Sequence, residues 1–470
     1  MPKKIHIQYA TYLADLHTPV SVYNKLRDQF PGALLFESAD YHDRTDNKSF
    51  ICLEPMANFQ AQGLDYSYSI GTEEETNKVA QSGTEVFDSL KAFVAAFEPT
   101  ESDLPFDTQG VWGYSAFESV QYFEDISFSK KADEIKANPD LKYQFFRYQI
   151  IFDHFKKTLY IVEHSLDKAA DDDSNIQRLH TLIHSNNYSH FDFQTDGPES
   201  SNITDETYMA MVSKGIEHCK RGDTFQVVLS REFRQAFKGD EFTLYRCLRS
   251  INPSPYLFYL DYGDFKIFGS SPESQLLVHK NIATINPIAG TVKRGHNLEE
   301  DRQKAEALRA NPKEISEHVM LVDLARNDLS KNSDNVEVET YAEIQYFSQV
   351  IHLVSKVNGT IKPDRSGIDL FGDTFPAGTL SGAPKYRALQ IIDENENQPR
   401  NFYGGALGFL GFSGTVNHSI IIRSILSKNN TLVYQAGAGI VVESSPKGEL
   451  DEIDNKVRAI RLSIAKANDI

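Results

Sequence analysis

Four glutamates near two predicted helix starts are the residues of this chain best suited to bind a divalent cation. Glu314 and Glu317 lie three residues apart after Asn311-Pro312, and Glu449 and Glu452 repeat that spacing far downstream. Residues three apart lie on the same face of a helix, so each pair presents two carboxylates side by side. Mg²⁺ prefers oxygen ligands and often shares them with a substrate. The two pairs predict a Mg²⁺ site if the fold brings them together.

The segment from residue 312 to 328 has the pattern of a helix that would position the first pair. Asn311 is a suitable N-cap, Pro312 suits the first helical position, and Val319 and Val322 belong to an apolar stripe of helical period. The helix dipole alone also favours an acidic first turn, so this pair by itself is compatible with a solvated surface. The second pair, which opens the last predicted helix, favours the metal site.

The composition indicates a globular protein with a large core and an anionic surface. The 470 residues suffice for one very large domain or two ordinary ones. A formal net charge of −18 argues against nucleic acid or an anionic membrane as partner. There is no apolar run long enough to span a membrane, and the three cysteines match no disulfide or metal framework. We therefore expect a cytoplasmic protein.

An abrupt change to polar sequence divides the chain. Residues 1–165 are rich in aromatic and β-branched runs that predict strands. Residues 166–203 contain clusters of Asp, Ser, Gly and Pro, which are typical of a linker. We predict an N-terminal subdomain at 1–165, a polar linker at 166–203, and a C-terminal domain at 204–470 that carries both acidic pairs.

Several polar residues stand inside apolar runs or at strand ends. Gln226 lies in a predicted strand, where a buried amide needs a partner or a ligand. Arg423 emerges from an apolar run, and Glu273 follows a predicted strand at a turn. His352 lies among apolar residues, where a lone histidine is more often a satisfied core residue than a catalyst. Structural and catalytic roles therefore both remain open for these residues.

Three segments rich in glycine or proline lie between the predicted strands. Residues 373–385 form a loop ahead of a predicted helix, whose free backbone N–H groups suit an anion. Residues 402–411 are glycine-rich but lack the lysine and the following helix of nucleotide-binding loops, so we exclude that function for them. Residues 437–440 present bare amides before the last helix.

Four motifs in the later part of the chain have to be considered together. They read Pro287-Ile-Ala-Gly-Thr291, Glu317-His-Val-Met-Leu-Val-Asp-Leu-Ala-Arg-Asn-Asp328, Phe375-Pro-Ala-Gly-Thr-Leu-Ser-Gly-Ala-Pro-Lys385, and Gly437-Ala-Gly-Ile440 followed by Glu449, Glu452 and Lys456. In type and order they resemble the motifs of chorismate-utilising enzymes, most closely those of the large subunit, component I, of anthranilate synthases. The resemblance covers residues from about 205 to about 465.

The resemblance implies both a fold and a reaction. The fold is of the α+β class, with two large, mostly antiparallel β-sheets packed as a sandwich and surrounded by helices. The reaction is the Mg²⁺-dependent conversion of chorismate and ammonia into anthranilate and pyruvate, the first committed step of tryptophan biosynthesis. The residues before 165 would form a regulatory subdomain, and those after 204 would bind chorismate.

Individual roles follow from the same resemblance. Glu273 would donate a proton, His352 would act as a base, Gln226 would hold ammonia, and Thr379 would position the substrate and His352. Glu314, Glu317, Glu449 and Glu452 would bind Mg²⁺. Contacts to the substrate are implied for Ala289, Gly290, Thr291, Tyr403, Arg423, Gly437, Ala438, Gly439 and Lys456.

Two positions discriminate between members of the family. Relatives that add water carry a basic lysine where Gln226 stands, so the glutamine favours the use of ammonia. Aminodeoxychorismate synthases commonly carry a nucleophilic lysine where Ala289 stands, so anthranilate is the preferred product and 4-amino-4-deoxychorismate the alternative. A third reading, a tryptophan-binding regulator without catalysis, is disfavoured because each catalytic group implied by the resemblance is present.

The resemblance also implies an inhibitor and a partner. A feedback site for L-tryptophan is implied at Ser38, Lys48, Pro255, Tyr256 and Leu257, with Leu257 standing where relatives usually have methionine. No Gly-x-Cys-x-Gly motif surrounds Cys52, Cys219 or Cys247, so the chain lacks the signature of a glutaminase nucleophile. We therefore expect ammonia to come from a separate glutamine amidotransferase subunit, component II.

Overall fold

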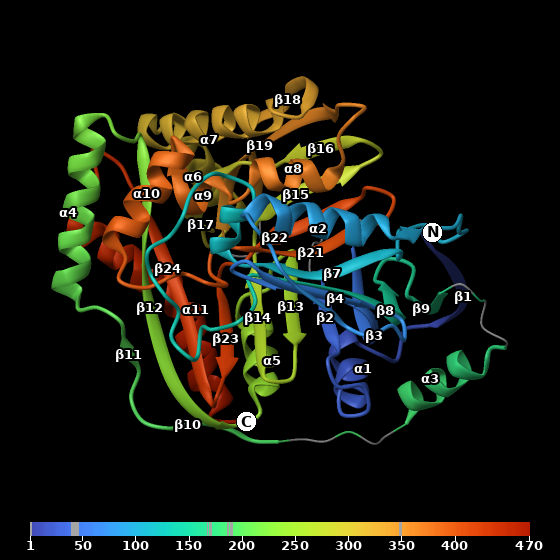
Figure 1. The fold of residues 1–470 in the computed structure, drawn as a ribbon. Coiled ribbons are helices and arrows are strands. Elements are labelled where there is room, and N and C mark those ends of the chain that lie inside the picture. Colours follow the sequence, from blue (N-terminus) through green and yellow to red (C-terminus); the bar gives the residue numbers. More distant parts are fainter. Residues whose placement is uncertain are drawn as a thin grey trace.

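The fold is built from paired β-strands that are covered by helices on their outer faces (Figure 1). The computed structural model describes residues 2–38, 47–166, 168, 172–185, 188, 191–346 and 350–470. Among the pairings of the described strands, only that of β1 (Lys3–Leu13) with β6 (Phe97–Glu98) is parallel. The predicted α+β class with mostly antiparallel sheets is confirmed.

The strands form two arms that meet where β3 pairs with β8. In pairing order, one arm contains β8 (Leu141–Asp153), β7 (Gly110–Ser115), β21 (Ala406–Gly411), β22 (Val416–Ile420), β15 (Ser274–His279), β16 (Ile282–Ile285) and β19 (Val350–Ile361). β19 also pairs with β17 (Ile288–Lys293) and with β18 (Ser333–Tyr346). The other contains β3 (Lys48–Gln62), β2 (Leu34–Glu37), β13 (Tyr256–Asp261), β14 (Phe265–Ser271), β23 (Ser424–Lys428), β24 (Thr431–Ile440) and β12 (Gln226–Gly239).

Smaller strands extend these arms. β9 (Thr158–Leu166) pairs with β8 and β1, β4 (Asp65–Ile70) pairs with β3 and β5 (Thr76–Val79), and β12 also pairs with β10 (Phe193–Thr195), β11 (Ser200–Ser201) and β20 (Gly382–Ala383). The longest strands thus each pair with several others.

An aromatic core lies between the two arms. Trp112 on β7 is 6% exposed, and its ring centroid lies 4.6 Å from Phe36, 4.9 Å from Phe50 and 4.8 Å from Phe409. The same cluster contains Phe258 of β13. Burying large rings from both arms at one interface holds the sandwich together, and the tryptophan is a core residue.

The helices cover the outer faces of the strands. They are α1 (Pro19–Leu26), α2 (Gly83–Ala95), α3 (Ser174–His184), α4 (Asp205–Arg221), α5 (Glu241–Ile251), α6 (Leu298–Ala310), α7 (Pro312–Ser330), α8 (Gly367–Thr374), α9 (Gly378–Ser381), α10 (Lys385–Asn395) and α11 (Pro446–Ala467), with a 3₁₀ helix, η1, at Phe117–Tyr122. None of the helices in the described residues is long and apolar enough to cross a membrane.

The two helices that carry the acidic pairs begin as their sequences predict. The Asn311 side chain accepts a hydrogen bond from the Lys313 amide at the start of α7, and Pro312 is its first residue. The Ser445 side chain accepts from the Gly448 amide at the start of α11. These local caps fix where each helix starts, so Glu314 and Glu449 lie in the first turns and Glu317 and Glu452 follow one turn later.

Backbone pairing joins the N-terminal and C-terminal parts of the chain. β2 pairs with β13, and β7 pairs with β21, so segments from 1–165 and 204–470 share both arms. Within the predicted linker, 166–203, the structure contains α3, β10 and β11. The division into two functional domains stays a prediction, but the two parts are not connected by the linker alone.

Candidate active site

A β-bulge places His352 beside two residues of the first motif. Where β17 pairs with β19, the register shifts between Ala289 and Thr291, so Gly290 is the extra residue. Gly290 has a φ of +69°, and a Cβ there would lie 3.2 Å from Glu314 Oε2. His352 Nδ1 lies 3.2 Å from the Gly290 carbonyl oxygen and 3.0 Å from Thr291 Oγ1. The bulge requires glycine and brings these groups together.

The contacts of His352 decide how its ring is protonated. A carbonyl oxygen only accepts hydrogen bonds, so Nδ1 carries the proton toward Gly290 and Nε2 is the basic nitrogen. Burial lowers the pKa of His352, and the nearby charge of Arg423 lowers it further, while the hydrogen bond to Gly290 opposes this. The imidazole is therefore neutral at pH 7 and can accept a proton.

Glu273 is a carboxyl group with an altered pKa at the turn before β15. Burial raises its pKa to about 7, while the hydrogen bond from Thr379 and the charges of Lys456 and Arg423 oppose the shift. Thr379 Oγ1, in the short helix α9, donates to Glu273 Oε1 over 3.0 Å. A carboxyl group with this pKa is partly protonated at neutral pH and can act as a general acid.

Gln226 lies at the start of β12 and contacts the acidic face of α7. Its Nε2 donates to Glu317 Oε1 over 3.2 Å. Its Oε1 is buried and has no hydrogen-bond partner among the described residues. A Cβ on Gly439 would come within 2.3 Å of Gln226 Nε2, so the glycine leaves the space in which the amide lies. The unpartnered oxygen is an acceptor suited to an N–H group of a ligand.

The glycines of β24 allow other groups to approach that strand closely. Lys456 Nζ donates to the Gly437 carbonyl oxygen over 2.7 Å and also pairs with Glu452 Oε1 at 2.7 Å. A Cβ on Gly437 would lie 3.0 Å from Tyr403 Oη, so this glycine leaves room for the phenol. Ala438, between the two glycines, is fully buried.

Arg423 lies in the connection between β22 and β23 with a left-handed backbone, φ +49°. Its Nη1 donates to Asn252 Oδ1 over 3.4 Å, and its carbonyl oxygen accepts from the Ser270 amide over 3.2 Å. Burial lowers the pKa of Arg423, while the charge of Glu273 opposes this. An arginine remains charged in such surroundings, so it can hold a carboxylate of a ligand.

The two acidic pairs lie near the starts of α7 and α11 and are close enough to affect one another. Burial raises the pKa of Glu317, and Glu314 and Glu452 raise it further. Burial also raises the pKa of Glu449, to which Glu452 contributes. Carboxylates affect one another in this way only over short distances, so the four glutamates form one acidic group.

This acidic group has the donor chemistry of a Mg²⁺ site. It offers carboxylate oxygens, and Glu449 Oε2 is buried without a partner in the described part of the chain. In residues 2–38, 47–166, 168, 172–185, 188, 191–346 and 350–470, no group of three or more His, Cys, Asp or Glu could hold a metal ion as arranged. Since Mg²⁺ commonly takes one or two carboxylates plus water and substrate oxygens, the residues fit such an ion. The Mg²⁺ site stays a prediction.

Two cavities lie on either side of α7. The larger, about 1310 Å³, is lined by Glu317 and by the 72% exposed Phe225. The smaller, about 40 Å³, is lined by Glu273 and Thr379. Side chains of α7, such as Leu324, contribute to both cavities. The helix therefore separates an open cleft from the Glu273–Thr379 pair.

The residues predicted to bind the inhibitor lie on neighbouring strands. β2 pairs with β13 so that Glu37 is opposite Leu257, which places Ser38 beside the start of β13 at residues 255–256. Lys48 is the first residue of β3, which also pairs with β2. The structure thus brings residues 34–38, residues 48–50 and the loop at 252–257 together at one end of these three strands.

Arg400 and Glu396 contact the site but were not predicted. Their spacing of four residues in a polar segment is also typical of a solvent-exposed helical ion pair, so the sequence carries no sign that both are buried. The structure shows an arginine that is 1% exposed and hydrogen-bonded to β12 and α9.

Comparisons with known proteins place this geometry in a family. The family model described as chorismate binding enzyme matches residues 33–462. Anthranilate synthase component 1 of Aquifex aeolicus (strain VF5) is 33% identical over 481 residues, covering 98% of this chain and 95% of the relative. Anthranilate synthase component 1 of Lactococcus lactis subsp. lactis (strain IL1403) is 36% identical over 462 residues, covering 95% and 97%.

Solved structures agree with these sequence matches. Anthranilate synthase component I from Streptococcus pneumoniae TIGR4 superposes with a TM-score of 0.77 at 32% identity, covering 88% of this chain and 92% of that chain. MenF, the menaquinone-specific isochorismate synthase from Escherichia coli, superposes with a TM-score of 0.75 at 18% identity, covering 98% and 95%. The second likeness shows the fold alone.

The hydrogen bond between Thr379 and Glu273 gives a prediction about protonation. Because this bond stabilises the carboxylate, Thr379→Val should raise the pKa of Glu273 above about 7. A pH titration followed by infrared difference spectroscopy, with Glu273→Gln as the subtraction control, measures it directly. An unchanged or lowered pKa would contradict the assigned contact.

Proposed function

Because the chain belongs to the family of chorismate-binding enzymes, we propose that it converts chorismate and ammonia into anthranilate, pyruvate and water with Mg²⁺, the first committed step of tryptophan biosynthesis. The observation that carries the proposal is Gln226, an uncharged amide hydrogen-bonded to Glu317. Adding water needs a base at this position, whereas ammonia is already a nucleophile and needs hydrogen-bond acceptors. The buried Ala289 offers no nucleophile for the covalent route to 4-amino-4-deoxychorismate.

Chorismate is a dianion, and the site offers separate surroundings for its two carboxylates. Arg423 and the amides of residues 437–439 would hold the carboxylate of the pyruvyl arm. Tyr403, whose pKa is raised by burial, is a neutral hydroxyl group beside Gly437 and would donate to the same carboxylate. Lys456 adds a positive charge at that end of the site.

Glu273 is the group proposed to protonate the departing C4 hydroxyl of the ring. Its pKa of about 7 leaves a substantial protonated fraction at neutral pH. Thr379 holds the carboxyl group in one orientation through its hydrogen bond. When the proton is transferred to the hydroxyl group, water leaves and the carboxylate that remains is stabilised by Thr379, Lys456 and Arg423.

Gln226 is proposed to hold ammonia for attack on the ring at C2. Its buried Oε1 can accept an N–H group, while Nε2 remains bonded to Glu317. This arrangement orients the nitrogen lone pair toward the ring without a proton transfer. The new bond forms between nitrogen and C2 as the C4 oxygen leaves with the proton from Glu273.

His352 is proposed as the base that restores the aromatic ring. Nε2 is the nitrogen with the lone pair because Nδ1 carries its proton toward Gly290. Removing the C2 proton allows the C–O bond to the pyruvyl arm to break, which releases pyruvate and leaves anthranilate. The lowered pKa of His352 keeps the ring neutral before this step.

Glu314, Glu317, Glu449 and Glu452 are the residues proposed to hold Mg²⁺ beside the ring carboxylate. When bound, the ion would neutralise charge on that carboxylate and ease attack at C2. The acidic group would therefore bind a doubly negative substrate only when a cation lies between them. The raised pKa values of Glu317 and Glu449 agree with this, because neighbouring carboxylates contribute to both shifts.

We also propose that a separate glutamine amidotransferase supplies the ammonia. Relatives of this chain are named component 1, which implies a second component of the enzyme. All three cysteines, Cys52, Cys219 and Cys247, are buried, and burial raises the pKa of each thiol. Such thiols are poor nucleophiles, so glutamine hydrolysis is assigned to the partner.

L-Tryptophan is proposed as a feedback inhibitor that binds at Ser38, Lys48, Pro255, Tyr256 and Leu257. The support is a direct contact between this region and the substrate site: Arg423 Nη1 donates to Asn252 Oδ1, three residues before Pro255. Asn252 also donates to Ser270 Oγ over 3.3 Å, and the Ser270 amide donates to the Arg423 carbonyl. An amino acid that moves the loop at 252–257 would therefore move Arg423.

The central test is a product assay on the purified chain. Incubation with chorismate, Mg²⁺ and ammonium at alkaline pH should yield anthranilate, which fluoresces and has a distinct mass, because ammonia reaches the site without the partner. A reaction without ammonium is the control. Isochorismate or 4-amino-4-deoxychorismate as the product, or no product, would overturn the proposal.

Removing one proposed metal ligand gives a second test. Glu317→Gln and, separately, Glu452→Gln should each lower turnover at limiting Mg²⁺ by about 100-fold or more, while the circular dichroism spectrum stays unchanged. Asp323→Asn, an exposed acidic residue on the same helix as Glu317, is the matched control and should keep wild-type turnover. Equal rates in the variants and the control would argue against the metal site.

The proposed inhibitor site gives a third test. Ser38→Arg should raise the tryptophan concentration for half inhibition at least about tenfold, a loss of about 1.4 kcal/mol of binding, while turnover without tryptophan stays unchanged. Ser213→Arg, at an exposed serine of α4, is the control. A Ser38→Arg variant as sensitive as wild type would rule out this location for the inhibitor.

A further inference from the structure

Arg400 is a buried cation that contacts the surroundings of the active site. It lies between α10 and β21, is 1% exposed, and pairs with Glu396 at 2.6 Å. Its guanidinium carbon lies 4.5 Å from the ring centroid of Phe117 and 5.9 Å from that of Tyr403. An arginine this deeply buried needs all of its charge and hydrogen bonds satisfied by the protein.

Besides its bonds to Glu396, the guanidinium donates hydrogen bonds to two segments, α9 and β12. Nη1 donates to the Leu380 carbonyl oxygen over 2.6 Å, and Leu380 directly follows Thr379 in α9. Nη2 donates to the Val228 carbonyl oxygen over 2.7 Å, two residues beyond Gln226 on β12. Its charge also acts on Tyr403, whose pKa it lowers against the larger effect of burial. Each contacted segment carries or adjoins a residue proposed to act on the substrate.

Glu396 extends this network to a second point of β12. Its Oε1 accepts from the Ser230 amide over 2.9 Å and from the Ser230 hydroxyl over 2.7 Å. Gln435 of β24 donates to the same hydroxyl over 2.7 Å. The pair therefore fixes β12 at Val228 and Ser230, on both sides of the Leu229 peptide, and reaches β24.

We propose that Arg400 and Glu396 are positioning residues that set Thr379, Gln226 and Tyr403 at fixed distances from one another. In the proposed reaction, Thr379 orients the acid and Gln226 holds the nucleophile. Arg400 and Glu396 would therefore align the group that protonates the leaving hydroxyl with the group that holds the attacking ammonia. The inference rests on the proposed function for the roles of these residues, but the network itself consists of direct contacts.

The chemistry of the pair explains why a charge is used here. Taking two charges out of water costs free energy, and apolar residues of similar volume often stabilise a protein as well or better. A planar guanidinium, however, donates in several fixed directions at once, which neither an apolar group nor a lysine ammonium can do. The directions of these hydrogen bonds hold α9 and β12 in one relative orientation.

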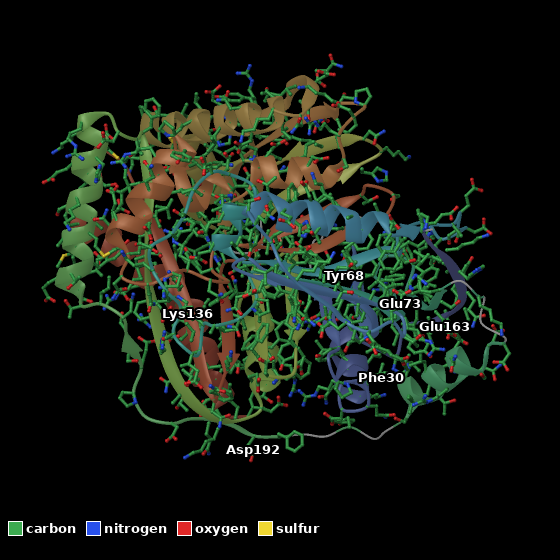
Figure 2. All side chains as sticks on the ribbon, viewed as in Figure 1. Phe30, Tyr68, Glu73, Lys136, Glu163 and Asp192 are labelled. Atoms are coloured by element: carbon green, nitrogen blue, oxygen red, sulfur yellow. The ribbon has the colours of Figure 1, made fainter. Side chains whose placement is uncertain are left out.

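A neighbouring buried pair shows that burial of charge alone is not the distinguishing feature. Lys136, labelled in Figure 2, is 1% exposed and donates to Glu232 of β12 over 2.8 Å. Its further contact is to the carbonyl oxygen of Pro399. Among the described residues, none of the hydrogen bonds of Lys136 goes to α9 or to Tyr403, so it supports the fold beside the site without joining the same groups as Arg400.

The test compares Arg400→Lys with Arg27→Lys. Arg27 is also a largely buried arginine, at 10% side-chain exposure, that donates through both terminal nitrogens to one carboxylate, Asp240, but it lies between α1 and α5. Both variants keep the charge and lose the planar fork. Arg400→Lys should lower kcat by at least about tenfold while KM for chorismate changes less than about threefold, because Arg423 and the amides of residues 437–439, which are proposed to hold the same carboxylate as Tyr403, are unchanged. Arg27→Lys should lower Tm without changing kcat.

A second readout does not require catalysis. Hydrogen–deuterium exchange at peptides that contain Leu380 and Val228 should be faster in Arg400→Lys than in wild type, and unchanged in Arg27→Lys. A wild-type protein that makes no anthranilate would reject the proposed function, and the exchange data would then still decide the inference. The inference would be overturned if Arg400→Lys exchanged hydrogen at these peptides as slowly as wild type. It would also be overturned if the loss of kcat in Arg400→Lys equalled the fraction of that variant that is unfolded.

Discussion

Mutual repulsion among four buried or half-buried glutamates is the interaction to which the rest of the site is adjusted. Glu314 and Glu449 lie in the first turns of α7 and α11, where the helix N-termini offset part of their charge, and Glu317 and Glu452 follow one turn later. Gln226 donates one hydrogen bond to Glu317, and Lys456 pairs with Glu452. These contacts leave a net negative surface. A cation would bind there, and the proposed doubly negative substrate would bind only together with that cation.

Close approach of backbone segments is the second condition for this arrangement. Gly439 leaves the space for Gln226, Gly437 leaves the space for Tyr403, and the bulge at Gly290 lets Glu314 and His352 both lie near this glycine. Each of these glycines lies on a strand, β17 or β24, where glycine normally weakens packing. Glycine occurs at these positions because the side chains of Gln226, Tyr403 and Glu314 approach the strands there.

The contact between Asn252 and Arg423 connects the loop at 252–257 with the proposed substrate site. The loop at 252–257 leads into β13, which pairs with β2 of the N-terminal segment, while Arg423 leads into β23 of the same arm. A ligand at the end of β2 would therefore act on the substrate site through the hydrogen bond between Asn252 and Arg423 and through the pairing of β14 with β23. Arg423 is held by the loop that leads into β13, whereas Arg400 holds α9 and β12.

Local features of the chain were readable from the sequence because they depend on residues close to one another. Asn311-Pro312 and Ser445-Pro446 place the starts of α7 and α11, and the four motifs identify the family and the mostly antiparallel α+β fold. The spacing of each glutamate pair within its own helix was equally predictable. These are properties of capping and periodicity, which a few consecutive residues determine.

Tertiary structure alone decided which of these local features meet. The register of β2 with β13 and of β7 with β21 joins segments separated by more than 200 residues. Nothing in the polar residues 394–400 indicates burial, yet packing buries Arg400 and Glu396 against β12 and α9. Burial and long-range pairing depend on the whole packed chain, so no short stretch of sequence specifies them.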